Sequence, residues 1–353
     1  MTAVIGWDIG GAHLKGARAE NGRVVAAVQV AAPLRLGLER LRQSFAEARA
    51  QLGDAGLHAV TMTGELADTF PSRADGVAAL TDCAVRELAP GKIAVYAGRA
   101  GFVAPEVARA NVADIASANW HATAALIGTR VSTALLMDMG STTTDIVPVA
   151  GGKVAARGYT DAERLATGEL VYTGLVRSFV MTMGARAPFA GSWTDLIREN
   201  FANMADVQRI LGRLPDGADQ MMTADGRDKT VAASRARLAR MVGRDVGDAD
   251  AAAWSALAHW FAELQIRAVS DGAMLVQSHH LLPPDAPVVV AGAGAAVLRE
   301  AARRIGRNCR ELDEFLPVAP ALRTAASVNA PAVAVALLAS RYACSEYEKT
   351  GTR

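Results

Sequence analysis

Two segments far apart in the chain follow one pattern: an apolar strand that ends in Asp-x-Gly, then a short polar turn that leads back into apolar residues. The first is VIGWDIGGAHLKGA (4–17), and the second is ALLMDMGSTTTDIVPV (134–149). The pattern is typical of a β-hairpin in which glycine allows a tight turn and close approach of a ligand to the backbone. Exposed N–H groups and hydroxyls in such a turn can donate to phosphate oxygens. Because each copy opens one half of the chain, the pair predicts a duplicated fold with two oxyanion-binding turns.

Composition excludes some classes of protein. The chain has 353 residues, enough for two ordinary domains, and its net charge of +1 argues against a nucleic-acid partner. The cysteines lack the spacing of a disulfide framework or metal site, which indicates thiols in a reducing cytoplasm: Cys83, Cys309 and Cys344. No signal-like segment precedes Val4, which already belongs to the first predicted strand.

The longest charge-free run lies between Arg323 and Arg341, and it is short for a bilayer. We therefore predict a buried helix there, no membrane partner and a cytoplasmic protein. The apolar helices leave room for a homodimer.

Two domains are predicted because the pattern restarts after residue 129. The first is 1–129 plus a C-terminal helix at 330–353, and the second is 130–329 with a helical insertion at about 191–280. Apolar periodicity predicts the remaining elements. The expected strands are 23–30, 57–61 and 92–98; the expected helices are 37–52, 76–88, 114–127, one from about 249 and one from 331; and 287–300 is expected to be strand, glycine turn and helix. Arginines at 235, 237, 240 and 244 share no single stripe, so we expect a solvated helix face.

The chain resembles the actin-like ATPase superfamily, which includes sugar kinases, heat-shock ATPases and actin. DIGG (8–11) with Lys15 resembles the first phosphate loop, DMGSTTTD (138–145) resembles the second, and VVVAGAG (288–294) resembles the strand and turn that meet the nucleoside. The resemblance implies an α/β protein made of two actin-like (ribonuclease H-like) domains with mixed β-sheets and an interdomain cleft.

Five segments narrow the resemblance to the hydantoinase/oxoprolinase-like group, and within it to a family linked to tetrahydromethanopterin-dependent one-carbon metabolism and methanofuran biosynthesis. They are DIGGAHLK (8–15), MTGEL (62–66), SANW (117–120), DMGSTTTDIVPV (138–149) and RLATGELVYTGLVR (164–177). The resemblance implies a transferase that joins 5-(aminomethyl)-3-furanmethanol diphosphate to the phenol of a γ-glutamyltyramine or tyrosine-type acceptor and releases diphosphate.

Such a reaction needs groups that bind and neutralise a diphosphate. The predicted diphosphate-binding residues are Gly10, Gly11 and Lys15 in the first turn, Gly140, Ser141 and Thr142 in the second, and Gly292 and Gly294 in the third. For Lys15, a solvated strand residue that binds no phosphate is an alternative of equal weight. Thr144 is expected to pack rather than bind.

Mg²⁺ is the expected cofactor, because it favours few carboxylates together with substrate phosphates. We predict Asp8 and Asp138 as its ligands, with Asp8 also acting in catalysis. The alternative for Asp8 is a side chain that hydrogen-bonds its own turn.

A phenol of pKa about 10 needs a base or a nearby cation to attack well. The candidate bases are Glu65 and Glu169, one in each TGEL segment, and Asp145. The competing interpretation is that each TGEL begins a helix, with Thr as the cap and Glu in the first turn. For Asp145 the competing interpretation is an ordinary turn-closing role. Arg164 and Arg177 could bind diphosphate or a carboxylate, with surface ion pairing as the default.

Three other functions stay open. One is an ATP-dependent small-molecule kinase. VVVAGAG (288–294) argues mildly against it, because the segment lacks the longer glycine run after the strand that lets a nucleoside lie close. The second is a hydantoinase/oxoprolinase-like ATPase, and ATP would be a cofactor only under these two. The third is a non-catalytic regulator, a class that generally carries a DNA-binding extension.

Overall fold

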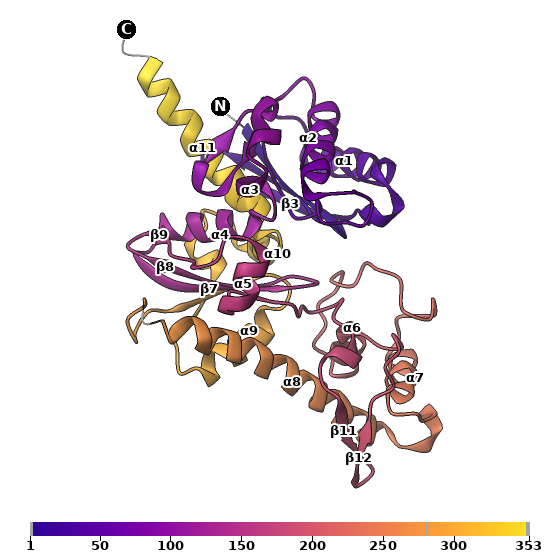
Figure 1. The fold of residues 1–353 in the computed structure, drawn as a ribbon. Coiled ribbons are helices and arrows are strands. Elements are labelled where there is room, and N and C mark those ends of the chain that lie inside the picture. Colours follow the sequence, from indigo (N-terminus) through magenta and orange to yellow (C-terminus); the bar gives the residue numbers. More distant parts are fainter. Residues whose placement is uncertain (1–2, 280, 351–353) are drawn as a thin grey trace. The chain divides into compact units, whose positions relative to one another are not determined.

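The structure is a computed structural model that describes residues 3–279 and 281–350 (Figure 1). Two compact units divide the chain. Unit 1 comprises Met1–Ala134, Val147–Ala156 and Arg310–Arg353, and unit 2 comprises Leu135–Ile146 and Arg157–Cys309. The sequence predicts divisions after residues 129 and 329, whereas the contacts divide the chain near 134 and 309 and assign 147–156 to unit 1.

The first sheet has the strand order β3-β2-β1-β4-β5-β6. β1 pairs antiparallel with β2, and β2 with β3, whereas β1, β4 and β5 run parallel. The sheet is therefore mixed, as predicted. Its strands are β1 (Ala3–Ile9), β2 (His13–Glu20), β3 (Arg23–Ala31), β4 (Leu57–Met62), β5 (Lys92–Tyr96) and β6 (Phe102–Val103).

Helices cover both faces of this sheet. Alternate residues of β1 point to opposite faces. On one face the indole of Trp7 packs edge-on against Phe45 of α1 (Leu38–Leu52), with ring centroids 5.2 Å apart, and α2 (Arg73–Glu87) belongs to the same core. On the other face Gly6 touches α11 (Ala330–Thr350), where a Cβ on Gly6 would collide with Ala332 and Ala336. A side chain at position 6 would therefore separate α11 from the sheet.

The buried helix predicted between Arg323 and Arg341 is confirmed for α11, whose residues 332–337 are buried, whereas residues 323–328 form a separate helix, α10 (Arg323–Val328). No single helix in the described part of the chain is long and apolar enough to cross a membrane. The pair Pro320–Val328 and Ala330–Tyr342, bent by 106°, meets the length and composition criteria only when taken together. Of the cysteines, Cys83 is buried and Cys309 is half-buried, and the side chain of Cys344 lies outside the described residues.

His58 of β4 is a buried histidine that accepts a hydrogen bond from the Trp7 indole at 3.1 Å. Its pKa is lowered from 6.5 to about 4, mainly by burial and further by Arg49, against the opposing effect of Asp54. Between these two pH values the unfolded chain binds a proton that the folded chain does not. The free energy of unfolding therefore falls as the pH falls from 6.5 toward 4, by about 3 kcal/mol in total.

His58→Gln removes the titrating ring, so we expect the variant to lose most of this pH dependence. Urea denaturation at pH 7 and at pH 4.5 measures it. The matching substitution of the exposed His259 provides the control. An unchanged acid sensitivity in His58→Gln would assign the effect to other groups.

The second sheet repeats the order of the first. Its order is β10-β8-β7-β13-β14, with β7 in the place of β1, β8 in that of β2 and β13 in that of β4. β13 runs parallel to β7, and β10 runs antiparallel to β8. The predicted duplication and the α/β class with mixed sheets are thus confirmed. The strands are β7 (Thr133–Met139), β8 (Thr144–Ala150), β9 (Lys153–Val154), β10 (Leu170–Val171), β13 (Val288–Ala291) and β14 (Cys309–Glu311).

Unit 2 also holds the predicted insertion, which is less helical than expected. A hairpin, β11 (Arg186–Phe189) and β12 (Ser192–Asp195), lies at its start, and residues 211–230 form no regular element (Figure 1). The long helix predicted from about 249 is α8. The helices of unit 2 are α5 (Asp161–Thr167), α6 (Met204–Ile210), α7 (Val231–Met241), α8 (Ala251–Gln277) and α9 (Ala295–Arg304).

The single helix predicted at 114–127 is wrong. It divides into α3 (Val112–Ile115) and α4 (Asn119–Gly128), because Ser117 has a φ of +53° and interrupts the helical path. In this conformation the Ser117 hydroxyl donates to Glu65 at 2.7 Å.

The prediction of a solvated arginine face on α7 is wrong for Arg237. Its side chain is 0% exposed, and it donates to Asp206 at 2.7 Å and to Asp225 at 3.1 Å. These contacts tie α6, α7 and the irregular segment 211–230 together.

Candidate anion-binding site

In the first turn, between β1 and β2, the carbonyl groups are hydrogen-bonded within the described chain and the amide groups are not. The carbonyl oxygens of Gly11 and Ala12 accept from the N–H groups of Leu34 at 3.0 Å and Ala32 at 2.8 Å. Within the described residues, the N–H groups of Gly11 and Ala12 donate to no protein acceptor. The turn therefore leaves two consecutive N–H donors without a protein acceptor in the part of the chain that the structure describes.

The second turn, between β7 and β8, also has hydrogen-bonded carbonyl groups and amide groups without an acceptor in the described protein. The carbonyl of Gly140 accepts at 3.0 Å and that of Ser141 accepts twice, at 3.1 and 2.8 Å, all from N–H groups of residues 175–177. No acceptor in the described chain receives the N–H groups of Ser141 or Thr142. Consecutive free amides beside satisfied carbonyls favour an anion over a cation.

The glycines at the tips of both turns are not required by the chain's own packing. A Cβ on Gly11 would meet no atom within 4 Å, and one on Gly140 would meet only the Thr143 carbonyl at 3.9 Å. The space in front of each turn is open, so a ligand can approach the backbone closely.

Gly174 packs against the backbone of the second turn. A Cβ there would lie 2.5 Å from the backbone N and C of Thr142. Beside it, the buried Thr144 hydroxyl donates to the Thr173 carbonyl at 2.7 Å, which is a packing role. The segment after the second TGEL therefore packs against the second turn and supports it.

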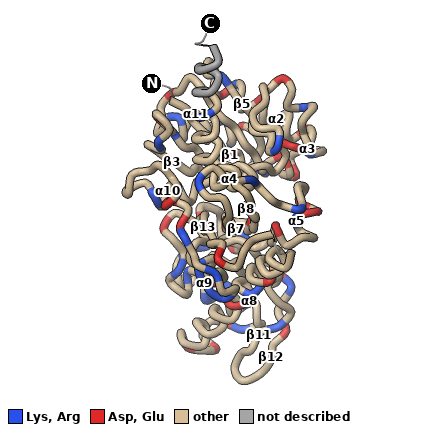
Figure 2. The backbone as a smooth tube through the Cα atoms, turned by 90° about the vertical axis from the view of Figure 1, so that its left-hand side faces the viewer, with Lys and Arg blue, Asp and Glu red and all other residues tan. Residues whose placement is uncertain are grey.

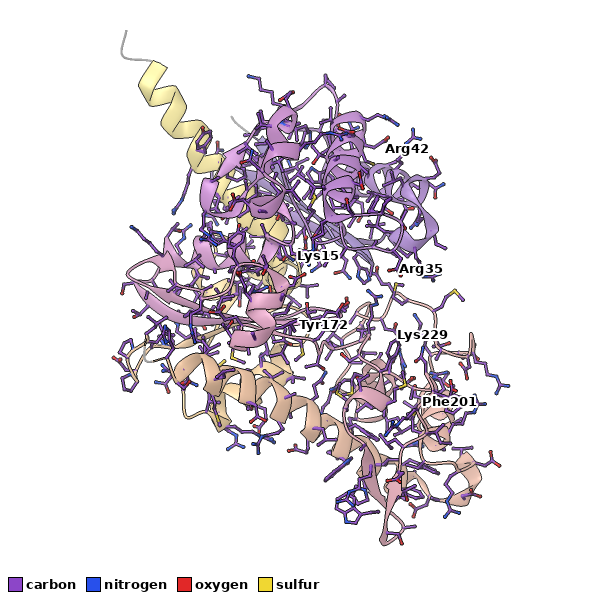
Figure 3. All side chains as sticks on the ribbon, in the orientation of Figure 1. Lys15, Arg35, Arg42, Tyr172, Phe201 and Lys229 are labelled. Atoms are coloured by element: carbon purple, nitrogen blue, oxygen red, sulfur yellow. The ribbon has the colours of Figure 1, made fainter. Side chains whose placement is uncertain are left out.

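Asp8 and Lys15 are cross-strand partners in β1 and β2. The Lys15 Nζ lies 3.9 Å from the Asp8 carboxylate, and the Asp8 side chain is 4% exposed against 19% for Lys15. Figure 3 shows Lys15 at the end of unit 1 that carries the first turn. Lys15 is therefore neither a fully solvated residue nor an isolated phosphate-binding charge.

The third turn meets the second at Asp138. Ala291 pairs with Asp138 in the parallel strands β13 and β7, so their carboxyl ends lie side by side. Gly292 has a φ of +84°, and a Cβ there would collide with the Asp138 carboxylate and the Met139 carbonyl. The N–H of Gly294, the residue before α9, donates to Met139 at 3.0 Å.

The carboxylates fit only a metal that arrives with a phosphate ligand. Within the described residues no three His, Cys, Asp or Glu side chains form a metal-binding group. Asp8 lies in unit 1 and Asp138 in unit 2, and each is a buried carboxylate next to a free-amide turn. Mg²⁺ keeps several waters and binds mainly through substrate phosphates, so one such carboxylate suffices for it.

Glu65 does not lie in the first turn of a helix, so the capping interpretation is wrong for it. α2 begins later, at Arg73, with Ser72 as its cap. Glu65 is 1% exposed and accepts from Ser117, so it links two segments inside unit 1.

The capping interpretation is also wrong for Glu169, because its TGEL ends α5 instead of beginning a helix. Gly168 closes α5 in the left-handed conformation. The Glu169 carboxylate accepts from the N–H groups of Arg157 at 2.6 Å and Gly158 at 2.8 Å, and from the Thr167 hydroxyl at 2.9 Å. Three donors give Glu169 a structural role.

Asp145 does not have the ordinary turn-closing role that was its alternative. It pairs with Arg164 at 2.8 Å, and because Arg164 is 1% and Asp145 15% exposed, this is a partly buried ion pair and not a surface one. Arg164 also donates to the Glu169 carbonyl at 2.9 Å. Arg177, in contrast, is exposed and donates to the Thr142 hydroxyl at 3.3 Å.

A buried polar network that the sequence analysis missed supports the second turn. Ser178 accepts from the Gly174 N–H at 2.8 Å, and Gln265 of α8 donates to the Gly174 carbonyl at 2.8 Å. Gln208 of α6 donates in turn to Gln265 at 3.2 Å. Nothing in the local sequence marks these residues, because Gln265 lies 91 positions from Gly174.

Comparison with known proteins places the chain in a family. Residues 57–341 match the Hydantoinase/oxoprolinase family. The chain belongs to this family. The match confirms the resemblance predicted from the glycine turns and the TGEL segments.

Two curated relatives carry one name, "(4-{4-[2-(gamma-L-glutamylamino)ethyl]phenoxymethyl}furan-2-yl)methanamine synthase". The protein from Methanocaldococcus jannaschii is 34% identical over 188 residues, which are 53% of this chain and 56% of that protein. The protein from Methanococcus vannielii is 28% identical over 174 residues, 49% of this chain and 77% of that protein. The chain thus spans little more than half the length of the first relative.

Solved structures resemble the chain only loosely. Component A of the (R)-2-hydroxyglutaryl-CoA dehydratase of Acidaminococcus fermentans is 14% identical, with a TM-score of 0.48 over 98% of this chain and 100% of that one. The ethanolamine utilization protein EutJ of Carboxydothermus hydrogenoformans is 13% identical, with a TM-score of 0.46 over 96% and 90%.

Proposed function

We propose that this chain is a transferase of methanofuran-type cofactor biosynthesis that joins a furanylmethyl group to a phenol oxygen and releases diphosphate. The observation that carries the proposal is the polarity of the two glycine turns, whose carbonyls are satisfied while their amides are free. Both relatives are named as synthases of a phenoxymethyl-furan methanamine. Such a product contains an ether between a phenol and a furanylmethyl carbon.

The proposed reaction balances as a substitution at that carbon. The phenol oxygen forms a bond to the methylene, the bond from the methylene to the diphosphate oxygen breaks, and the phenolic proton passes to a base. The electron-rich furan tolerates positive charge on the methylene, so bond breaking can run ahead of attack. The chain's main task is then to stabilise the departing anion and orient the phenol.

The free amides of residues 11–12 and 141–142 are suited to that task, since they are fixed donors that need no rearrangement when charge develops. Asp8 or Asp138 would hold Mg²⁺, which adds positive charge beside the phosphate oxygens. Tyr172, 68% exposed, follows β10 two residues before Gly174 and offers an aromatic surface for a ring (Figure 3).

Asp145 and Glu65 are the proposed bases. Glu169 is a weaker choice because both its oxygens already accept hydrogen bonds. Asp145 is 15% exposed and Glu65 only 1%, so Asp145 is more accessible to a phenol.

The test is to incubate the full chain and Mg²⁺ with a furanylmethyl diphosphate and a tyramine-type phenol. We expect pyrophosphate release that depends on the phenol, and an ether product of matching mass. A parallel incubation with ATP and the phenol should consume no ATP. Phosphoryl transfer from ATP without reaction of the furanylmethyl diphosphate would instead establish the kinase alternative.

A further inference from the structure

Arg177 is fixed relative to the second turn by the backbone. Its own N–H and that of Val176 both donate to the Ser141 carbonyl, at 2.8 and 3.1 Å. Gly174 packs directly on Thr142, and Gln265 and Ser178 hold the Gly174 peptide groups. The start of the Arg177 side chain therefore has a defined position beside the turn.

The guanidinium of Arg177 also points to this turn. Its Nη1 donates to the Thr142 hydroxyl at 3.3 Å, and the residue is exposed. Within the described chain Arg177 forms no ion pair with a carboxylate. Its positive charge therefore has no counter-charge from the described protein.

Several other cations of the molecule contrast with Arg177. Basic and acidic positions both lie along α9 (Figure 2). There Arg303 and Arg304 both pair with Glu300, at 2.7 and 2.8 Å. Two cations near the predicted site are matched as well, Lys15 by Asp8 and Arg164 by Asp145. An uncompensated arginine beside two free amides is the arrangement expected for an anion that is not part of the chain.

We propose that Arg177 binds the diphosphate at the second turn, together with the N–H groups of Ser141 and Thr142. The inference rests on the proposed function and names the cation that function requires. A guanidinium has five donors in a planar fork, so one can stay on Thr142 while others bind two oxygens of a phosphate. This makes Arg177, rather than Lys15, the principal charge for the leaving group.

The test measures binding of inorganic pyrophosphate to the full chain by titration calorimetry, with and without Mg²⁺. Arg177→Gln is expected to weaken binding about 10- to 100-fold, because it removes charge-assisted hydrogen bonds. Arg177→Lys keeps the charge but loses the fork, so it should fall between Gln and the parent. Arg267→Gln, at a surface pair with Asp271 in the same unit, is the matched control and should bind as the parent does.

Amide NMR gives a second readout that a folding defect would not imitate. Pyrophosphate should shift the N–H signals of Ser141 and Thr142 in the parent and in Arg267→Gln, and barely move them in Arg177→Gln. Equal pyrophosphate affinity in Arg177→Gln and the parent, or no binding by the parent, would overturn the inference.

The outcomes also separate this inference from the proposed function. Binding that depends on Arg177 without ether formation keeps the anion site and removes the transferase. Ether formation at the parental rate in Arg177→Gln keeps the transferase and removes the role of Arg177.

Discussion

Replacing Gly174 by alanine is expected to lower the rate of diphosphate release about 100-fold or more, because a displacement of about 1 Å at a reacting group has an effect of this size. The new Cβ would lie 2.5 Å from the backbone N and C of Thr142, far inside contact distance. The turn must then move away from the segment that positions it, and its free amides move with it. Steady-state kinetics with a furanylmethyl diphosphate and a phenol measure the loss.

Two further glycine variants distinguish a loss of diphosphate binding from a loss of stability. Gly140→Ala meets only the Thr143 carbonyl, at 3.9 Å, so its melting temperature should be unchanged while diphosphate binding weakens. Gly306→Ala also has open space but a φ of +72°, so it should cost about 1 kcal/mol of stability and leave turnover intact. Parental turnover in Gly174→Ala would show that the second turn takes no part in the reaction.

The sequence predicted the turns and the duplicated sheets because both depend on local patterns. In each copy, alternating apolar residues define two neighbouring strands, and Asp-x-Gly marks the turn between them. The same pattern does not predict which backbone N–H and C=O groups of the turns stay without a hydrogen-bond partner. That depends on Leu34 in unit 1 and on residues 175–177 in unit 2, which reach the turns from other parts of the chain.

The capping interpretation is wrong for the second TGEL segment, at 167–170, because a Thr-x-Glu sequence fits either end of a helix. At α5 the real capping box is Thr160 with Glu163, whose side chains bond each other's N–H groups. The spacing S/T-x-x-E at 160–163 is the usual signal, and it was present in the sequence. With that start in place, Gly168 becomes the left-handed C-terminal residue, and Glu169 falls outside the helix.

The ionic cluster of the insertion could not be predicted, because its members are far apart in sequence. Asp206 and Arg237 lie 31 positions apart, and Asp225 lies in a segment without periodicity. In the structure the Asp206 carboxylate accepts from Arg237 at 2.7 and 2.9 Å and from Ser234 at 2.8 Å. Charged residues that look like surface positions in the sequence thus form a buried ion pair in the structure.

Removing the Asp206 carboxylate is expected to lower the free energy of unfolding by about 3 kcal/mol, the lower end of the usual effect of breaking a buried ion pair, because Arg237 keeps Asp225 as a second partner. Asp206 is 2% exposed and Arg237 is 0% exposed, so water cannot easily replace the lost contacts. Urea denaturation of Asp206→Ala measures the change. Hydrogen exchange should show early loss of protection in 211–230, which Arg237 holds through Asp225 and the Asp228 carbonyl at 3.1 and 3.3 Å.

Asp271→Ala is the matched control, since it removes an ion pair of similar length, 2.6 Å from Arg267, at the surface of α8. Its cost should stay below about 1 kcal/mol, because exposed pairs are well solvated. Asp206→Leu combined with Arg237→Met removes both charges and should recover much of the loss, as apolar replacements of buried pairs do. If Asp206→Ala and Asp271→Ala cost the same, the pair with Arg237 is accessible to water and does not hold the insertion together.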